Sequence, residues 1–124
     1  MPKTVLIVDD EPNIIVPLRF LMEQNGYRVL VAADGEEALK IIAGDVPDLI
    51  LLDIMLPGVD GYEVCQNVRE NPQWRNTKVI FLSALGRDID IVKGMALSAD
   101  AYITKPFAID DVVEKVNRLL SDNG

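Results

Sequence analysis

The chain has 124 residues, a length that fits one domain and can bury a core without disulfides or a structural metal. Twelve lysines and arginines against twenty aspartates and glutamates give a formal net charge of −8. The chain therefore lacks the positive surplus with which proteins bind nucleic-acid backbones or anionic membranes. With no histidine and one cysteine, the sequence also excludes His-based metal sites, histidine-dependent nucleophilic catalysis and Cys-rich metal clusters.

The sequence also carries no sign of a targeting or membrane segment. No apolar run approaches the roughly 18 residues of a membrane span, and Met1 is followed almost directly by a short apolar run. We therefore expect neither a secretory signal nor a membrane anchor, and the single cysteine fits a reducing, cytoplasmic compartment. We expect residues 1–124 to form one domain with its core in residues 3–120. The tail at 121–124 is expected to be the end of the last helix or the start of a linker.

Five short apolar runs alternate with segments of helical periodicity along the chain. The runs are rich in β-branched residues and nearly continuous in hydrophobicity, as in parallel strands covered on both faces. They comprise residues 4–8, 29–32, 49–52, 79–82 and 101–104. After each run, apolar residues recur at helical spacing, as Ile14, Leu18 and Leu21 do after the first. The pattern predicts an α/β fold with a doubly wound, five-stranded parallel sheet and five helices.

Turn and capping residues agree with these limits. Asp34-Gly35 is expected to open the second helix, Pro57-Gly58 with Asp60-Gly61 to form a turn-rich loop before the third, and Asn25-Gly26 to end the first. The acidic pairs Glu36-Glu37 and Asp110-Asp111 are expected in the first turns of their helices, where the helix dipole favours negative charge.

Polar residues stand where the predicted strands end, and in doubly wound folds this edge carries the functional groups. Asp9, Asp10 and Glu11 follow the first strand, Asp53 the third, Ser83 the fourth and Lys105 the fifth. If the first and third strands are neighbours, their spacing of about 5 Å brings Asp9, Asp10 and Asp53 within reach of one ion. A site made only of oxygen ligands suits a hard divalent cation, so the sequence predicts a site for Mg²⁺ or Mn²⁺.

The same positions carry the motifs of a known family. The motifs are Val8-Asp9-Asp10-Glu11, residues 51–57 (LLDIMLP) followed by Asp60-Gly61, then Ser83-Ala84, and Lys105-Pro106-Phe107 with Tyr102 three residues before the lysine. In this order they make the sequence resemble a CheY-like receiver domain of two-component response regulators over essentially the whole chain. The resemblance implies a flavodoxin-like (βα)5 fold with strand order 2-1-3-4-5, and a cis peptide bond between Lys105 and Pro106.

The resemblance also implies roles for the acidic residues. Asp53 would be the phosphoacceptor, which attacks a phosphohistidine on a partner kinase or phosphotransfer protein. Asp10, Asp53 and the backbone carbonyl of Met55 would bind Mg²⁺ directly, and Asp9 would hold a metal-bound water. Such a domain is a signalling module that catalyses only its own phosphorylation and dephosphorylation.

Four further residues would take up the new phosphoryl group and transmit its presence. Lys105, the Ser83 hydroxyl and the backbone N–H of Ala84 would contact the phosphoryl oxygens. As Ser83 moves inward, Tyr102 would turn from an exposed to a buried position. This repacking would alter the face made by the fourth helix, the fifth strand and the fifth helix, which signals to an output domain or a downstream protein.

The resemblance leaves the output of the protein open. Members that bind DNA through another domain commonly pair their receivers through this face, often with two acidic residues before the switch aromatic. Here Asp100-Ala101 keeps one of the two, which weakens the expectation of that homodimer on phosphorylation.

Met55 and Leu85, two residues after Asp53 and Ser83, flank the path of an attacking water. Because both are apolar, we expect a long-lived phosphoryl group.

Three other functions compete with this interpretation. A haloacid-dehalogenase-type phosphatase also uses an Asp at a strand end with Mg²⁺, but it places a second Asp where this chain has Met55. A flavodoxin needs a Ser/Thr/Gly-rich phosphate loop, where this chain has Asp9-Asp10-Glu11. A receiver that only binds proteins, without phosphorylation, is disfavoured by the intact set of acids together with Ser83 and Lys105.

Several conspicuous side chains are expected to be structural. Cys65 is expected to be a small apolar residue on a helix face. Met22, Met55 and Met95 are expected to fill gaps or lie in loops, and Trp74 to be peripheral.

Overall fold

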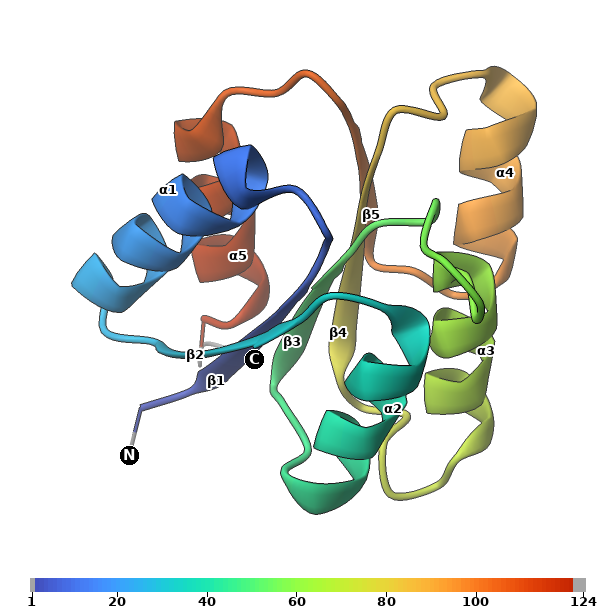
Figure 1. The fold of residues 1–124 in the computed structure, drawn as a ribbon, viewed down its shortest axis with the longest axis horizontal. Helices are drawn as coiled ribbons and strands as arrows, with labels where there is room; N and C mark the ends of the chain where they lie inside the picture. Colours follow the sequence, from blue (N-terminus) through green and yellow to red (C-terminus); the bar gives the residue numbers. More distant parts are fainter. Residues whose placement is uncertain (1, 122–124) are drawn as a thin grey trace.

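A computed structural model describes residues 2–121, in which strands and helices alternate throughout (Figure 1). The strands are β1 (Thr4–Val8), β2 (Arg28–Ala32), β3 (Leu49–Leu52), β4 (Lys78–Ser83) and β5 (Ala101–Thr104). The helices are α1 (Pro12–Gln24), α2 (Gly35–Gly44), α3 (Gly61–Glu70), α4 (Asp88–Ala96) and α5 (Ile109–Leu119). Each strand lies within one residue of its predicted limits, so the expected alternation is confirmed. The end of the predicted tail, residues 122–124, lies outside the described residues.

The five strands form one parallel sheet in the order β2-β1-β3-β4-β5, as predicted. β1 and β3 lie next to each other inside the sheet, and every residue of both is buried. This burial explains their continuous hydrophobicity, because helices cover both faces of a parallel sheet. The register pairs Val8 with Leu52, so the next residue of each strand emerges at the same edge.

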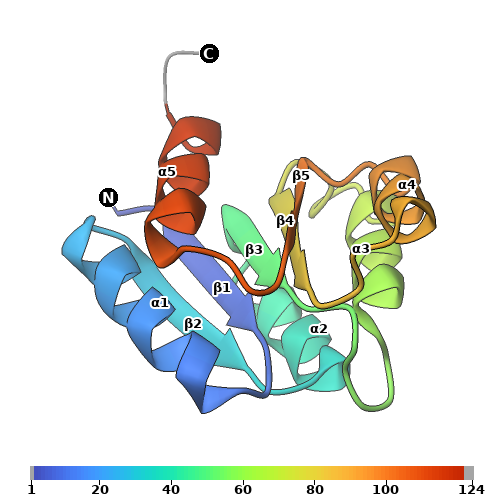
Figure 2. The same ribbon diagram turned by 90° about the horizontal axis from the view of Figure 1, so that it is seen from above.

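Successive residues of each strand point to opposite faces, and two apolar cores result. On one face, Val5 and Ile7 pack with α1 and α5; on the other, Leu6 and Val8 pack with α2 and α3. Figure 2 shows α1 and α5 on one side of the sheet and α2, α3 and α4 on the other. Both layers leave the carboxyl edge of the sheet open to the loops that follow the strands. In the described part of the chain, no helix is both long and apolar enough to cross a bilayer.

Local expectations are largely confirmed, with two corrections. Asp34 and Asp60 cap α2 and α3, each accepting a hydrogen bond from the backbone N–H three residues later. Cys65 is fully buried, and burial raises its pKa to about 11. Trp74, expected to be peripheral, instead packs half-buried against the α2–α3 core. Met95, expected to fill a gap, lies on the exposed side of α4.

Arg69 of α3 fastens the amino-terminal ends of β4 and β5. Its Nε donates to the carbonyl of Ser98 at 2.9 Å, and its Nη2 lies 3.0 Å from Oδ2 of Asp100. The same carboxylate oxygen accepts the backbone N–H of Val79 at 2.8 Å. Asp100, the acid retained from the family's dimerisation pattern, is therefore engaged within its own chain.

We expect Ser98→Gly to stabilise the protein. Ser98 has a φ of 66°, a left-handed conformation that is costly for a residue with a Cβ and free for glycine. Its carbonyl, which Arg69 requires, is retained in the variant. The free energy of unfolding from urea denaturation should rise by about 0.5–1 kcal/mol.

Ala96→Gly, at an exposed position of α4 two residues earlier, is the matched control. It should lower the free energy of unfolding by about 0.5–1 kcal/mol, because its backbone is helical. The same sign of change in both variants would contradict the assignment of strain to Ser98.

Candidate functional site

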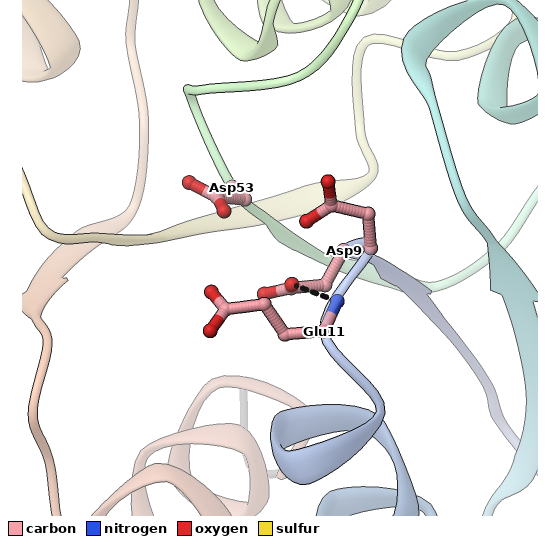
Figure 3. Close-up of side chains that lie close together, drawn as sticks. Asp9, Glu11 and Asp53 are labelled. Atoms are coloured by element: carbon pink, nitrogen blue, oxygen red, sulfur yellow. Dashed lines mark hydrogen bonds between the residues drawn. The ribbon is translucent and has the colours of Figure 1, made fainter.

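Two aspartates lie side by side where β1 and β3 end. The backbone N–H of Asp53 donates to the carbonyl of Val8 at 3.0 Å, which extends the strand pairing by one residue. The two carboxylates are nearly inaccessible: Asp9 is 1% exposed and Asp53 is 5% exposed. Figure 3 shows the side chains of Asp9, Glu11 and Asp53 gathered at this edge. The sheet register therefore brings together the acids that the sequence placed at separate strand ends.

Lys105 joins these acids from the end of β5. Its Nζ lies 2.9 Å from Oδ2 of Asp9 and 3.1 Å from Oδ2 of Asp53, and its side chain is only 11% exposed. Its backbone N–H donates to the carbonyl of Ser83 at 2.8 Å, which ties Lys105 to the end of β4. The peptide bond between Lys105 and Pro106 is cis, as the resemblance implied. One ammonium thus links the ends of β1, β3 and β5.

Glu11 is a member of this cluster to which the sequence analysis gave no role. Its Oε1 accepts a third hydrogen bond from Lys105 Nζ at 2.9 Å. Its backbone N–H donates to Oδ1 of Asp9 at 2.9 Å, the dashed line in Figure 3. The signal in the sequence was the third consecutive acid after β1, at an edge that also holds a lysine.

Burial and hydrogen bonding act in opposite directions on the two charges of the site. Burial raises the pKa of Asp9 above its ordinary value, and the hydrogen bond from Lys105 offsets only part of this effect. For Lys105, burial alone would lower the pKa, but hydrogen bonds to Glu11, Asp9 and Asp53 outweigh it and raise the pKa instead. Lys105 therefore stays charged, and the ionised form of Asp9 depends on it.

The acidic cluster has the composition of a site for a hard cation. Asp9, Asp10, Glu11 and Asp53 each offer a carboxylate oxygen, and these oxygens all lie within 4.8 Å of one another. Asp10 and Glu11 are exposed, so the cluster is open to solvent on one side. When ionised, four carboxylates and one ammonium leave three excess negative charges. The oxygen-only donor set and this excess charge fit a divalent cation such as Mg²⁺.

The loop after Asp53 is held close by a glycine. A Cβ at Gly61 would lie 2.2 Å from the carbonyl oxygen of Asp53 and 2.7 Å from Cα of Ile54, distances that no side chain can occupy. The backbone N–H of Gly61 donates to the Ile54 carbonyl at 2.9 Å. The chain then turns so that the N–H of Met55 donates to Oδ1 of Asp53 at 3.2 Å, while the Met55 side chain is exposed. Both oxygens of Asp53 therefore accept a hydrogen bond.

The predicted switch residues lie on the next two strands of the sheet, Ser83 on β4 and Tyr102 on β5. Ser83 is fully buried, and its Oγ accepts the backbone N–H of Leu85 at 3.2 Å. Ala84, between them, is exposed. The Tyr102 hydroxyl donates to the carbonyl of Leu85. Tyr102 is half-buried rather than exposed, and burial raises the pKa of its phenol. The structure thus holds Tyr102 turned inward, in contrast to the exposed starting position that we expected.

Comparison with known proteins agrees with this geometry. The family model described as the response regulator receiver domain matches residues 5–117. The chain belongs to this family. The receiver domain is a signalling domain of two-component systems, and the matched residues include the whole site.

Relatives of this receiver domain match over most of its length. The alkaline phosphatase synthesis transcriptional regulatory protein PhoP of Bacillus subtilis (strain 168) is 44% identical over 120 residues, which are 97% of this chain and 49% of that protein. The chain thus spans about half the length of this curated relative. A putative response regulator from Chloroflexus aurantiacus J-10-fl is 36% identical with a TM-score of 0.90, covering 98% of this chain and 99% of that one. The BeF3-activated DrrB receiver domain is 33% identical with a TM-score of 0.88, covering 97% and 98%.

We expect Lys105→Met to destabilise the receiver domain at pH 7 in the presence of a chelator. Two nearly inaccessible carboxylates would lose their shared ammonium, a change that costs about 3 kcal/mol of unfolding free energy. The pKa of Asp9, already raised, would rise further. Because the native state then binds a proton more tightly than the unfolded state does, the variant should recover stability as the pH falls from 7 towards 5.

Lys40→Met, at an exposed lysine of α2, serves as the control and should change the unfolding free energy little at either pH. A loss in Lys105→Met that is equal at pH 7 and pH 5 would contradict the dependence of Asp9 on Lys105.

Proposed function

We propose that this receiver domain accepts a phosphoryl group on Asp53 from a phosphohistidine of a partner histidine kinase or phosphotransfer protein. One observation carries the proposal: the Lys105 ammonium donates hydrogen bonds to Asp53 and Asp9 at the ends of adjacent strands. An acceptor carboxylate, a positively charged side chain and a cluster of acids that can bind a metal ion therefore lie at one edge of the sheet. The partner supplies the histidine that this chain lacks.

The transfer step needs little from the protein beyond positioning and charge. A carboxylate oxygen of Asp53 forms a bond to phosphorus while the P–N bond breaks, and the electron pair of that bond stays on the departing imidazole nitrogen. The product is an acyl phosphate with about two negative charges. Lys105, the Ser83 hydroxyl and the N–H of Ala84 are the donors that we assign to the phosphoryl oxygens.

We assign the cation of this reaction to Asp10, Asp53 and the carbonyl of Met55, with Asp9 acting through a bound water. When bound, Mg²⁺ supplies the positive charge that offsets repulsion between the acidic cluster and the incoming phosphoryl group. The chain supports such a site by its all-oxygen donor set and by the exposure of Asp10, which leaves an approach from solvent. Mn²⁺ prefers similar ligands and is expected to replace Mg²⁺.

The output that we propose is a change in the packing of α4, β5 and α5. In this proposal Ser83 turns towards the phosphoryl group, and Tyr102, on the neighbouring strand, is favoured in its inward position. A cytoplasmic partner or an output domain of the same protein would detect the altered face. Pairing of two receivers through this face would differ from the family pattern, because Asp100 is bonded to Arg69 and residue 101 is a buried alanine.

The phosphatase alternative lacks its general acid in this geometry. The residue two positions after Asp53 is Met55, whose side chain is 60% exposed and carries no ionisable group. The flavodoxin alternative would place a phosphate against the excess negative charge of Asp9, Asp10 and Glu11. Neither alternative is favoured by a specific observation.

Incubation with acetyl phosphate and Mg²⁺ tests the acceptor. We expect intact mass spectrometry to detect one added phosphoryl group, absent in Asp53→Asn and absent when the metal is removed by a chelator. Asp111→Asn, at an exposed acid of α5, is the control and should be labelled like the unmodified protein.

Two outcomes would contradict the proposal. Labelling that survives Asp53→Asn would place the acceptor elsewhere, and steady turnover of an external phosphate monoester would favour the phosphatase.

The lifetime of the acyl phosphate gives a further test. We expect Leu85→Glu and Met55→Asn to shorten its half-life by about tenfold, because each introduces a polar group that can orient an attacking water. Half-lives would be measured by intact mass after removal of acetyl phosphate. Val92→Asn, an apolar-to-polar change on the exposed side of α4, is the control. An unchanged half-life in both site variants would contradict the assignment of Leu85 and Met55.

A further inference from the structure

Helix α4 approaches the sheet most closely at a glycine. Gly94 is buried in the interior of α4, where glycine disfavours the folded state by about two- to fivefold relative to alanine. A Cβ at this position would lie 3.0 Å from Cδ2 of Tyr102, and 3.1 and 3.2 Å from Cδ2 and Cε2 of Phe81. Carbon atoms in contact normally lie about 3.5–4.0 Å apart, so a Cβ at residue 94 would require at least one of the two rings to move by a few tenths of an ångström.

Of the two rings, only that of Tyr102 has open space into which it can move. Phe81 is fully buried, and its ring packs edge-on against Tyr62, with centroids 5.7 Å apart, and at a tilt against Tyr102, with centroids 5.9 Å apart. Tyr62 is tied to α4 through its hydroxyl, which donates to the Asp90 carbonyl at 3.3 Å. Tyr102 stands on the edge strand β5 and is half-buried, so its ring can swing towards solvent. A methyl group at residue 94 would therefore displace Tyr102 outward.

The inward position of Tyr102 is connected to the phosphorylation site. Its hydroxyl donates to the carbonyl of Leu85, and the N–H of Leu85 donates to Oγ of Ser83. An outward ring would give up the bond to Leu85. The Tyr102 side chain therefore couples the space beside Gly94 to the position of the segment that follows Ser83.

We propose that Gly94 is a positioning residue for Tyr102. By lacking a side chain it leaves the space that keeps Tyr102 inward on Leu85, and so it sets the balance between inward and outward positions of this ring. Residue 94 thereby determines how readily the domain adopts its phosphorylated packing; this second statement rests on the proposed function.

A double-mutant cycle in urea denaturation tests the packing part without any phosphorylation. We expect Gly94→Ala to raise the unfolding equilibrium constant in the unmodified protein and in Tyr102→Phe, which keeps the ring and loses only the hydroxyl. In Tyr102→Ala, the same substitution should leave the constant unchanged or lower it. The effects in the two kinds of background should differ by about tenfold.

Gly44→Ala is the matched control, because a Cβ at this last residue of α2 meets nothing within 4 Å. It should lower the unfolding equilibrium constant by about two- to fivefold in every background. Equal effects of Gly94→Ala with and without the Tyr102 ring would overturn the proposal.

The position of the ring gives a readout that a loss of stability alone would not move. With ring-labelled tyrosine, nuclear Overhauser contacts between Tyr102 and Phe81 should weaken in Gly94→Ala and persist in Gly44→Ala. The apparent affinity for beryllofluoride with Mg²⁺ should fall by about fivefold, since only the fraction with Tyr102 inward is competent.

Unchanged ring contacts in a folded Gly94→Ala protein would overturn the positioning role. Unchanged beryllofluoride affinity with displaced ring contacts would overturn the link to phosphorylation. Failure of Asp53 to accept a phosphoryl group would instead overturn the proposed function and leave the double-mutant cycle interpretable.

Discussion

The bond network of the Lys105 ammonium is the interaction on which the functional edge of this receiver domain depends. Two adjacent and nearly inaccessible carboxylates, Asp9 and Asp53, would repel each other strongly, and each would lose solvation without a partner. The Lys105 ammonium donates a hydrogen bond to each of them and a third to Glu11. One ammonium cannot neutralise the four carboxylates of the cluster. The negative charge that remains makes this edge of the sheet suitable for a divalent cation.

The sheet turns this local network into a device that reaches other parts of the molecule. Tyr102 lies on β5 and Lys105 lies just beyond its end. One strand therefore connects the acidic cluster with the packed rings of Tyr102 and Phe81. The backbone of Lys105 is bonded to Ser83, and Tyr102 contacts the Phe81 ring on the same strand as Ser83. A shift at the end of β4 therefore has a short path to α4, through packed rings.

Much of this was predictable from the sequence because strands, caps and strand-end residues depend on local pattern. The apolar runs marked all five strands, and Asp34 marked the start of α2, where it accepts a hydrogen bond from a residue only three positions away. The role of Glu11 was not predicted, because it depends on a hydrogen bond from a lysine 94 residues away in the chain. Trp74 escaped because its burial depends on a core assembled from α2, α3 and the sheet.

The sequence by itself determined the element order, the doubly wound fold class and the oxygen-rich chemistry of the strand ends, because these follow from side-chain periodicity and composition. Only the tertiary structure decided which strand ends meet, which acids share Lys105, and that Tyr102 lies inward against Gly94. The physical reason is distance along the chain. Lys105 and Asp9 are 96 residues apart, and their contact exists only because β1, β3, β4 and β5 lie side by side in one parallel sheet.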